Sequence, residues 1–420
     1  MIMDKQESQI DYQKMRSWFE KRKGTISNIL IDYINLNTIS PNESIWFPFV
    51  IKYLSELWFN VRYEPLNIDI KNNEQFSPHV DSKVTSDRWN LRAMYKKSDN
   101  NYKSVLFNCH IDVVPASDNF KQAFDWYIKD NCVYWRWACD TKNNLIMLWE
   151  AIRFLHDNWI PLRKNPLIDI VIDEEIWGNW TLSTIISWID ANEVICLEPT
   201  HLEIFRGHRW CITFEVTIKW SSTHMWSKEK WINAIEYAYE IIKLLKELEK
   251  KLLLEAKNNK DFNCWETPLQ LNIGMIKWGE RSWSVPEYCT ITCDLGFLPD
   301  YSLKDIQWLI EKTCKSVDNK FVSDNLIIAY KGLKNDAYIL NENIPLINEL
   351  MHAMKKCWVE QKKTYWWKVS CDSRYYDKVK KIPVITFWSG DLSNAHSSNE
   401  YVDLDELIKW SCILADYLST

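Results

Sequence analysis

Glycine is the residue whose scarcity most constrains the fold of this chain. The 420 residues include 8 glycines, about 2% where soluble proteins average about 7%, whereas tryptophan occurs 25 times. A chain of this length needs glycine in tight turns and in left-handed backbone conformations, which a residue with a Cβ enters only at a cost. Either tryptophan occupies these turns, or the tryptophans stand for another residue.

The local contexts favour the second interpretation. Some bacteria read the codon UGA as glycine, and a translation table that reads UGA as tryptophan would print a sequence of this kind. We therefore hypothesise that many tryptophans are glycine in the cell, although individual positions such as Trp18 are compatible with true tryptophan. The alternative is a tryptophan-rich protein that binds carbohydrate or peptide through exposed indoles. Segments that become typical glycine turns after the replacement are 133–140 (VYWRWACD), 177–180 (WGNW), 366–367 (WW) and 388–390 (WSG).

The remaining composition is that of a soluble globular protein. The length and the mass of 50.3 kDa exceed one small core and predict two domains, or one large domain with an insert. The net charge of −6 does not favour a basic surface for nucleic acid, and we find no apolar run of the about 18–20 residues that a membrane span needs. Residues 1–7 lack a signal-peptide pattern, and twelve cysteines without a C-x-x-C pair predict reduced thiols in a cytosolic protein.

Strands that alternate with helices predict an α/β sheet. Apolar strands are expected at 105–109, 167–172, 194–197 and 382–387, and helices at 11–38, 44–59 and 145–155.

A different pattern interrupts this alternation. Strand, helix, two strands and helix are expected at 211–218, 233–256, 269–276, 288–295 and 302–316, an order that suggests a ferredoxin-like insert of about 120 residues. We therefore expect a catalytic domain formed by 1–206 and 329–420, with an inserted domain at 207–328.

Acidic and histidine side chains follow the predicted strands or lie in the glycine-type loops. Each of them taken singly is more often structural or solvated, so the prediction rests on their joint occurrence. Because ligands of open α/β sheets bind beyond the carboxyl ends of the strands, these side chains can converge. Two histidines with several carboxylates suit zinc or a similar metal, and a shared carboxylate would hold two metals about 3.5–4 Å apart. The residues are His110, Asp112, Asp140, Asp173, Glu174, Glu175, Glu198 and His396.

The motifs around these residues occur in a specific order. They are CHIDVVP at 109–115, WRWACDTK at 135–142, DEE at 173–175 with Gly178, EPT at 198–200, and AH at 395–396 with NEYV at 399–402. This set resembles the zinc-dependent exopeptidase and deacylase family that includes acetylornithine deacetylase, succinyl-diaminopimelate desuccinylase, aminoacylase and carboxypeptidase G. The resemblance implies a mixed-sheet α/β catalytic domain with an inserted ferredoxin-like α+β domain that serves as lid and dimerisation domain.

The resemblance also implies a pair of divalent metal ions. His110 and Glu198 would bind one ion, Glu175 and His396 the other, and Asp140 would bridge the two. Zinc is the expected metal, with cobalt or manganese as alternatives.

Further roles follow from the same resemblance. Asp112 would orient the imidazole of His110, and Glu174 would be the general base that takes a proton from the metal-bridging water and passes it to the leaving amine. His224 in the insert would stabilise the oxyanion, often across a dimer interface. Arg374 is a candidate for holding a substrate carboxylate, with a surface salt bridge as the alternative, and Asn272 is a candidate substrate-side residue.

The chain departs from the family pattern at three positions. Asn143 and Asn144 stand where the family has Gly-Gly, and Cys109 stands where glycine or an apolar residue is common. A strand residue next to a ligand points to the opposite face of the sheet, so we interpret Cys109 as a core residue rather than a metal ligand.

We expect a cytoplasmic, homodimeric two-metal hydrolase that cleaves the amide bond of an N-acyl amino acid. A dipeptidase or carboxypeptidase of the same family, acting on short peptides, is the alternative. A catalytically inactive binding relative is a third reading, which the presence of Asp140, Glu174 and His396 argues against. We expect neither nucleic acid nor membrane as a partner.

Overall fold

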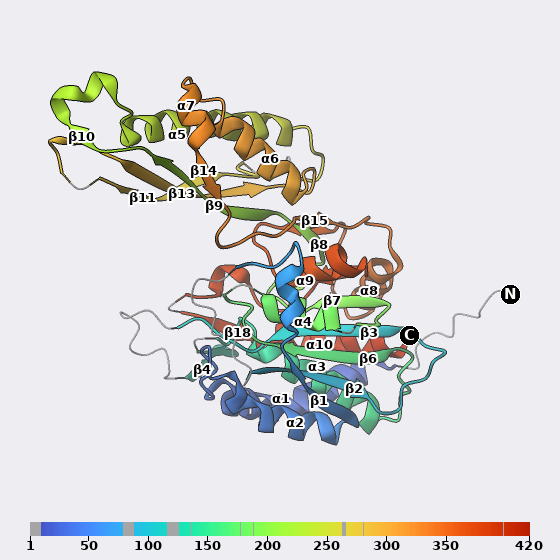
Figure 1. Cartoon of the computed structure of the whole chain (residues 1–420). Coiled ribbons are helices and arrows are strands. Elements are labelled where there is room, and N and C mark those ends of the chain that lie inside the picture. Colours follow the sequence, from blue (N-terminus) through green and yellow to red (C-terminus); the bar gives the residue numbers. More distant parts are fainter. Residues whose placement is uncertain are drawn as a thin grey trace.

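The larger part of the chain is a mixed sheet between layers of helices (Figure 1). The computed structural model describes residues 10–78, 88–115, 126–135, 137–176, 178–187, 189–262, 266–279, 281–397 and 399–420. Within these ranges the sheet runs in the spatial order β1 (Phe59–Pro65), β2 (Trp89–Tyr95), β6 (Asn165–Val171), β3 (Ser104–His110), β7 (Glu193–Cys196), β17 (Val384–Thr386), β8 (Phe205–His208) and β15 (Tyr338–Ile339), with β16 (Tyr365–Trp367) also paired to β8. The predicted α/β class is therefore confirmed.

Four central strands of this sheet set the position of the site. β6, β3, β7 and β17 are mutually parallel, so their carboxyl ends lie at one edge. Alternate residues of β3 enter different cores: Phe107 and Cys109 pack in one hydrophobic cluster and Leu106 in another. Cys109 is thus a buried core residue, as the sequence indicated.

Helices bury each face of the sheet. The cluster that includes Phe107 and Cys109 draws on α1 (Tyr12–Ile34), α2 (Phe47–Glu56), α3 (Lys142–Asp157), α8 (Pro345–Lys356) and α10 (Leu404–Ser419). The cluster that includes Leu106 draws on α4 (Asn179–Ser187) and α9 (Ser373–Tyr375).

Short elements complete this part of the chain. A small antiparallel sheet joins β18 (Tyr401–Asp403), β5 (Cys132–Tyr134) and β4 (Tyr127–Lys129), and four single-turn helices are η1 (Glu43–Trp46), η2 (Ile68–Asn72), η4 (Tyr376–Lys380) and η5 (Leu392–Asn394). No helix in the described ranges combines the length and the apolar composition that a membrane crossing requires.

The smaller body has the predicted ferredoxin-like topology. Its strands lie in the order β11, β13, β9, β14, all antiparallel, with the helices packed on one face (Figure 1). Its elements follow the chain as β9 (Trp210–Lys219), α5 (Ala234–Ala256), β11 (Leu271–Trp278), β13 (Tyr288–Phe297), α6 (Leu303–Cys314), α7 (Lys320–Asn325) and β14 (Ile327–Ala329), while β10 (Thr223–His224), η3 (Met225–Lys230) and β12 (Ser284–Val285) form a projecting end. The proposed boundaries of the inserted domain both lie inside strands, residue 207 in β8 and residue 328 in β14.

One predicted helix was placed wrongly at its end. The helix expected at 44–59 begins as η1, continues as α2 and stops at Glu56, and the edge strand β1 starts at Phe59. The chain reverses at Trp58, whose φ of +63° is incompatible with a continued right-handed helix. Strands β1 and β2 were not predicted, because their partly polar pattern lacks a continuous apolar run.

Three helices are followed by tryptophan in a left-handed conformation. Trp58, Trp159 and Trp358 come one residue after the cap of α2, α3 and α8, with φ of +63°, +56° and +60°. Glycine is the usual residue at this position because a Cβ there costs about 1–2 kcal/mol. The Trp159 indole is 92% exposed, so no packing compensates the strain. The geometry supports the hypothesis that glycine stands at these positions in the cell.

Buried tryptophans give a second sign of the same mismatch. The ring centroids of Trp388 and Trp410 lie 3.6 Å apart at an interplanar angle of 68°, closer than the about 4.5–7 Å usual for aromatic pairs. Within the described ranges, buried indole N–H groups without a hydrogen-bond partner include those of Trp46, Trp149, Trp180, Trp366 and Trp410.

The predicted glycine turns are described only in part. Trp137, in the turn before Asp140, has a φ of +76°. Arg136 and Trp177 lie outside the described residues.

A single substitution tests this interpretation. Trp159→Gly will raise the free energy of unfolding by about 1 kcal/mol, because it removes the left-handed strain. Trp308, also exposed but inside α6, is the matched control, and glycine there will lower the same quantity by about 1 kcal/mol. Urea unfolding followed by circular dichroism measures both. A destabilised Trp159→Gly protein, or UGG codons at these positions in the gene, would contradict the interpretation.

Candidate metal centre

The five predicted ligand side chains lie together at the carboxyl edge of the parallel strands. His110 is the last residue of β3, Glu198 follows β7 by two residues, and Glu175 follows β6 by four. Asp140 precedes α3 by two residues, and His396 follows η5 by two. The parallel register of β3 with β6 and β7 brings these loops to one edge, as the strand-end argument predicted.

Asp140 occupies the middle of this group. Its Oδ1 lies 3.1 Å from His110 Nε2 and its Oδ2 lies 3.1 Å from His396 Nε2. On one side Glu198 Oε1 is 3.8 Å from His110 Nε2, and on the other Glu175 Oε1 is 3.0 Å from His396 Nε2. The donor atoms form two triads, each within 4.8 Å, that share Asp140.

The charges of the group fit a pair of divalent cations. Burial lowers the pKa of His110, but Glu198, Asp112 and Asp140 outweigh burial and raise this pKa well above its ordinary value. Hydrogen bonds to Asp140 and then Glu175 raise the pKa of His396 to about 10. Burial raises the pKa of Glu175 and Glu198, whereas for Asp140 the effect of burial is outweighed by hydrogen bonds from His110 and His396, which lower its pKa. Three carboxylates in a largely buried space are an environment that favours bound cations. Imidazole and carboxylate donors suit zinc, cobalt or manganese.

Asp112 is buried and holds two parts of the site in place. Its backbone oxygen lies 3.0 Å from His110 Nδ1, and its carboxylate oxygen Oδ1 lies 3.7 Å from the same nitrogen. The same carboxylate accepts the backbone N–H of Glu174 at 3.2 Å and of Glu175 at 3.0 Å. Asp112 therefore clamps the turn that carries both glutamates, a contact that the sequence did not reveal.

Glu174 lies next to the ligand group without joining either triad. Burial, followed by the nearby Asp372 carboxylate, raises the pKa of Glu174 well above its ordinary value. A carboxylate with a raised pKa is better suited to accept and return a proton near neutral pH.

Glu400 is a site residue to which sequence reasoning gave no role. This buried carboxylate accepts the backbone N–H of Cys139 at 2.9 Å and of Asp140 at 3.1 Å through one oxygen, Oε1. Burial raises its pKa to about 7. The sequence feature that could have indicated this role is the position of Glu400 in the last motif, NEYV at 399–402, directly before β18. Glu400 fixes the turn that presents Asp140.

The two asparagines that replace Gly-Gly serve the same turn. Asn143 donates from Nδ2 to the carbonyls of Ala138 and Cys139, and its Oδ1 accepts the indole N–H of Trp388 at 2.7 Å. Asn144 donates to the carbonyl of Leu197 at 2.9 Å, one residue before Glu198. These departures from the family pattern therefore link the loops of the site.

Two predicted residues lie on the insert instead. His224 is exposed in β10, which lies at the end of β9 farther from β8 (Figure 1). The ten residues of β9 span roughly 30 Å at the usual rise per residue of a strand. Asn272 is exposed on the edge strand β11, whose register places it near the start of β9. The structure of one chain does not bring His224 to the metal-ligand group.

Arg374 is buried, so the salt bridge considered as its alternative role lies inside the protein and not at the surface. Its Nη2 donates to the Tyr375 hydroxyl at 3.0 Å, and its Nη2 lies 3.9 Å from Asp372. The guanidinium carbon packs 4.2 Å from the ring centre of Trp210.

Comparison with known proteins places this geometry in a family. The model of peptidase family M20/M25/M40 matches residues 106–420, and the chain belongs to this family. It is 26% identical over 393 residues to an uncharacterized metallohydrolase of Methanocaldococcus jannaschii, covering 90% of this chain and 95% of the relative. It is 21% identical over 398 residues to acetylornithine deacetylase of Photorhabdus laumondii, covering 93% and 94%.

A solved structure shows the same fold. Aminopeptidase PepT from Bacillus cereus superposes with a TM-score of 0.74 at 15% identity, covering 94% of this chain and 98% of that chain. The family membership and these relatives identify the chain as a metal-dependent hydrolase, as the motifs predicted.

The role of Glu400 has a measurable consequence. Glu400→Ala will weaken zinc binding to the metal-free protein about 10–100-fold, because the turn that carries Asp140 loses both hydrogen bonds. Glu400→Gln will weaken it less, since the amide oxygen can still accept both N–H groups. The control is Glu193→Ala, which removes an equally buried carboxylate bonded to Tyr417 at the opposite end of β7. Titration calorimetry showing equal losses for Glu400→Ala and Glu193→Ala would refute the assignment.

Proposed function

We propose that this hydrolase uses two divalent metal ions to remove the acyl group from an N-acyl amino acid. The observation that carries the proposal is the carboxylate of Asp140, whose two oxygens point to two different histidines, each with a further glutamate. The acetylornithine deacetylase relative, which the chain matches over nearly its whole length, favours a deacylase.

The ligand assignment follows the two triads. His110 and Glu198 would hold one ion, Glu175 and His396 the other, and Asp140 would contact both. Two such ions, when bound, polarise the substrate carbonyl and make water acidic enough to supply hydroxide near neutral pH. We propose zinc, with cobalt or manganese as alternatives.

The protein's own groups would handle the protons. Glu174 would accept a proton of the attacking water as the new C–O bond forms to the carbonyl carbon. It would then return this proton to the nitrogen of the leaving amine, and the amide C–N bond would break in this second step. Asp112 would keep Glu174 and Glu175 aligned through their backbone N–H groups. His110 would keep its orientation through the contacts of its Nδ1 with Asp112.

Two further roles complete the proposal. Arg374 would bind the substrate carboxylate. The indole of Trp210 covers one face of its guanidinium, and this face would be open if position 210 is one of the glycines that we hypothesise. His224 would donate to the oxyanion, and because β9 holds it far from the ligands of its own chain, we propose that it acts on a second copy in a homodimer. Asn272 would face the substrate from the junction end of the insert.

The general base can be tested apart from metal binding. Glu174→Gln will lower kcat about 10²–10⁴-fold while metal content stays normal, because the carboxylate moves a proton and lies in neither triad. Glu175→Gln is the neighbouring control and will lose metal, since Glu175 belongs to a triad. Kinetics and elemental analysis on the same preparations decide, and metal loss in Glu174→Gln would reassign this residue as a ligand.

Substrate class is tested by a hydrolysis screen with zinc, cobalt or manganese. N-acetyl and N-succinyl amino acids will be cleaved with a higher kcat/KM than dipeptides and tripeptides. Turnover of peptides alone would replace the deacylase by a peptidase of the same family. A metal-loaded protein that binds these compounds without hydrolysis would indicate an inactive relative.

A further inference from the structure

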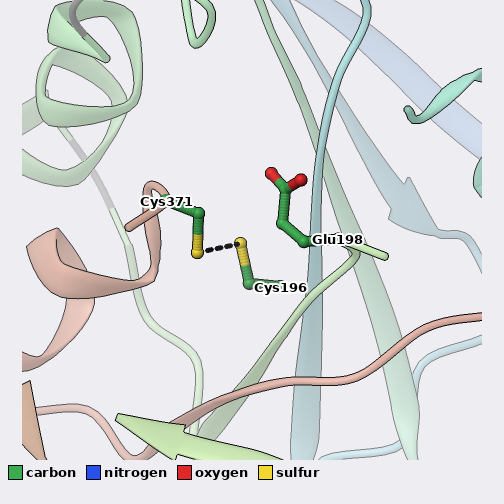
Figure 2. A group of neighbouring side chains, drawn as sticks. All are labelled: Cys196, Glu198 and Cys371. Carbon is green, nitrogen blue, oxygen red and sulfur yellow. Dashed lines mark hydrogen bonds between the residues drawn. The ribbon is translucent and has the colours of Figure 1, made fainter. Parts of the chain in front are cut away.

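A second cluster of metal-binding side chains adjoins the centre. Cys196 is the last residue of β7, Glu198 follows it by two residues, and Cys371 precedes α9 by two. Figure 2 shows the two sulfurs facing one another with the Glu198 carboxylate beside them. All three residues are buried, and their donor atoms lie within 4.8 Å of one another.

The spacing of the two sulfurs matches a shared metal ion. The Sγ atoms of Cys196 and Cys371 are 3.9 Å apart. With zinc–sulfur bonds of about 2.3 Å and a tetrahedral angle, two thiolates on one ion lie about 3.8 Å apart. A disulfide would require about 2.05 Å. The pair is thus spaced as two ligands of one ion without movement of either strand end.

The surroundings of the sulfurs are polar although the pair is buried. Cys371 Sγ lies 3.0 Å from Ser373 Oγ and 3.6 Å from Thr386 Oγ1, and the thiol of Cys196 donates to Asn108 Oδ1 at 3.1 Å, a bond that metal binding by this sulfur would replace. These hydroxyl groups can donate to a thiolate sulfur. Within the described residues, this is the one group of three potential ligands that does not contain Asp140, and it shares Glu198 with the triad of His110.

We propose that Cys196, Cys371 and Glu198 bind a third, thiophilic divalent cation, such as zinc in excess or cadmium. Each thiol releases its proton to water as its sulfur binds the ion, and water fills the fourth position. Because Glu198 belongs to this group and to the triad of His110, the third ion draws its carboxylate away from that triad. The site therefore inhibits the hydrolase when thiophilic metal is abundant. The inhibition rests on the proposed function, whereas the binding does not.

Cadmium titration of the full-length, metal-free protein tests the site. The wild type will bind three cadmium ions per chain and show thiolate-to-cadmium charge-transfer absorption in the ultraviolet. Cys371→Ser will bind two ions without this absorption, and Cys196→Ser will do the same. The control is Cys289→Ser in the insert, a buried thiol outside the cluster, which will behave as the wild type.

The outcomes separate this proposal from the metal pair. Absorption unchanged in Cys371→Ser, or two ions without absorption in the wild type, would overturn the thiol site and leave the pair standing. One ion with thiolate absorption would support the thiol site and refute the pair. In zinc-loaded enzyme, one further equivalent of cadmium will reduce turnover of the wild type and of Cys289→Ser, and will leave Cys371→Ser unaffected.

Discussion

The contact of one carboxylate, Asp140, with two imidazoles is the interaction on which the site depends. A buried carboxylate is costly unless positive charge or hydrogen bonds compensate it, and here Glu175 and Glu198 add further negative charge. The raised pKa values of His110 and His396 favour protonation of both imidazoles, yet two positive charges still leave one of the three carboxylates uncompensated. The proposed pair of divalent cations would resolve this conflict and would account for the three carboxylates at one edge of the sheet.

The residues around Asp140 hold its carboxylate in position. The parallel strands bring His110 and the two glutamates to one edge, but Asp140 lies in a turn that needs separate support. Glu400 supplies it by accepting two backbone N–H groups of this turn, and Asn143 supplies it by donating to two of its carbonyls. On this proposal, metal affinity would depend also on Glu400 and Asn143, which belong to neither triad.

The sequence correctly predicted the elements that carry a local signal, such as a continuous apolar run or a spaced motif. The apolar runs predicted β3, β6 and β7, and the spaced motifs predicted which side chains meet beyond them. It missed β1 and β2, whose patterns are partly polar, and it ran a helix past Trp58. It also missed the pair Cys196 and Cys371, because two single cysteines 175 positions apart carry no spacing signal. They meet because Cys196 of β7 pairs in register with Thr386 of β17, and the segment before α9 places Cys371 Sγ 3.6 Å from the Thr386 hydroxyl oxygen.

Anomalous X-ray diffraction from crystals of the zinc-loaded protein, recorded at the zinc absorption edge, tests the central claim most directly. The account predicts two peaks about 3.5–4 Å apart with the carboxylate of Asp140 between them, one beside His110 and Glu198 and one beside Glu175 and His396. A single peak, or two peaks that do not share Asp140, would contradict it.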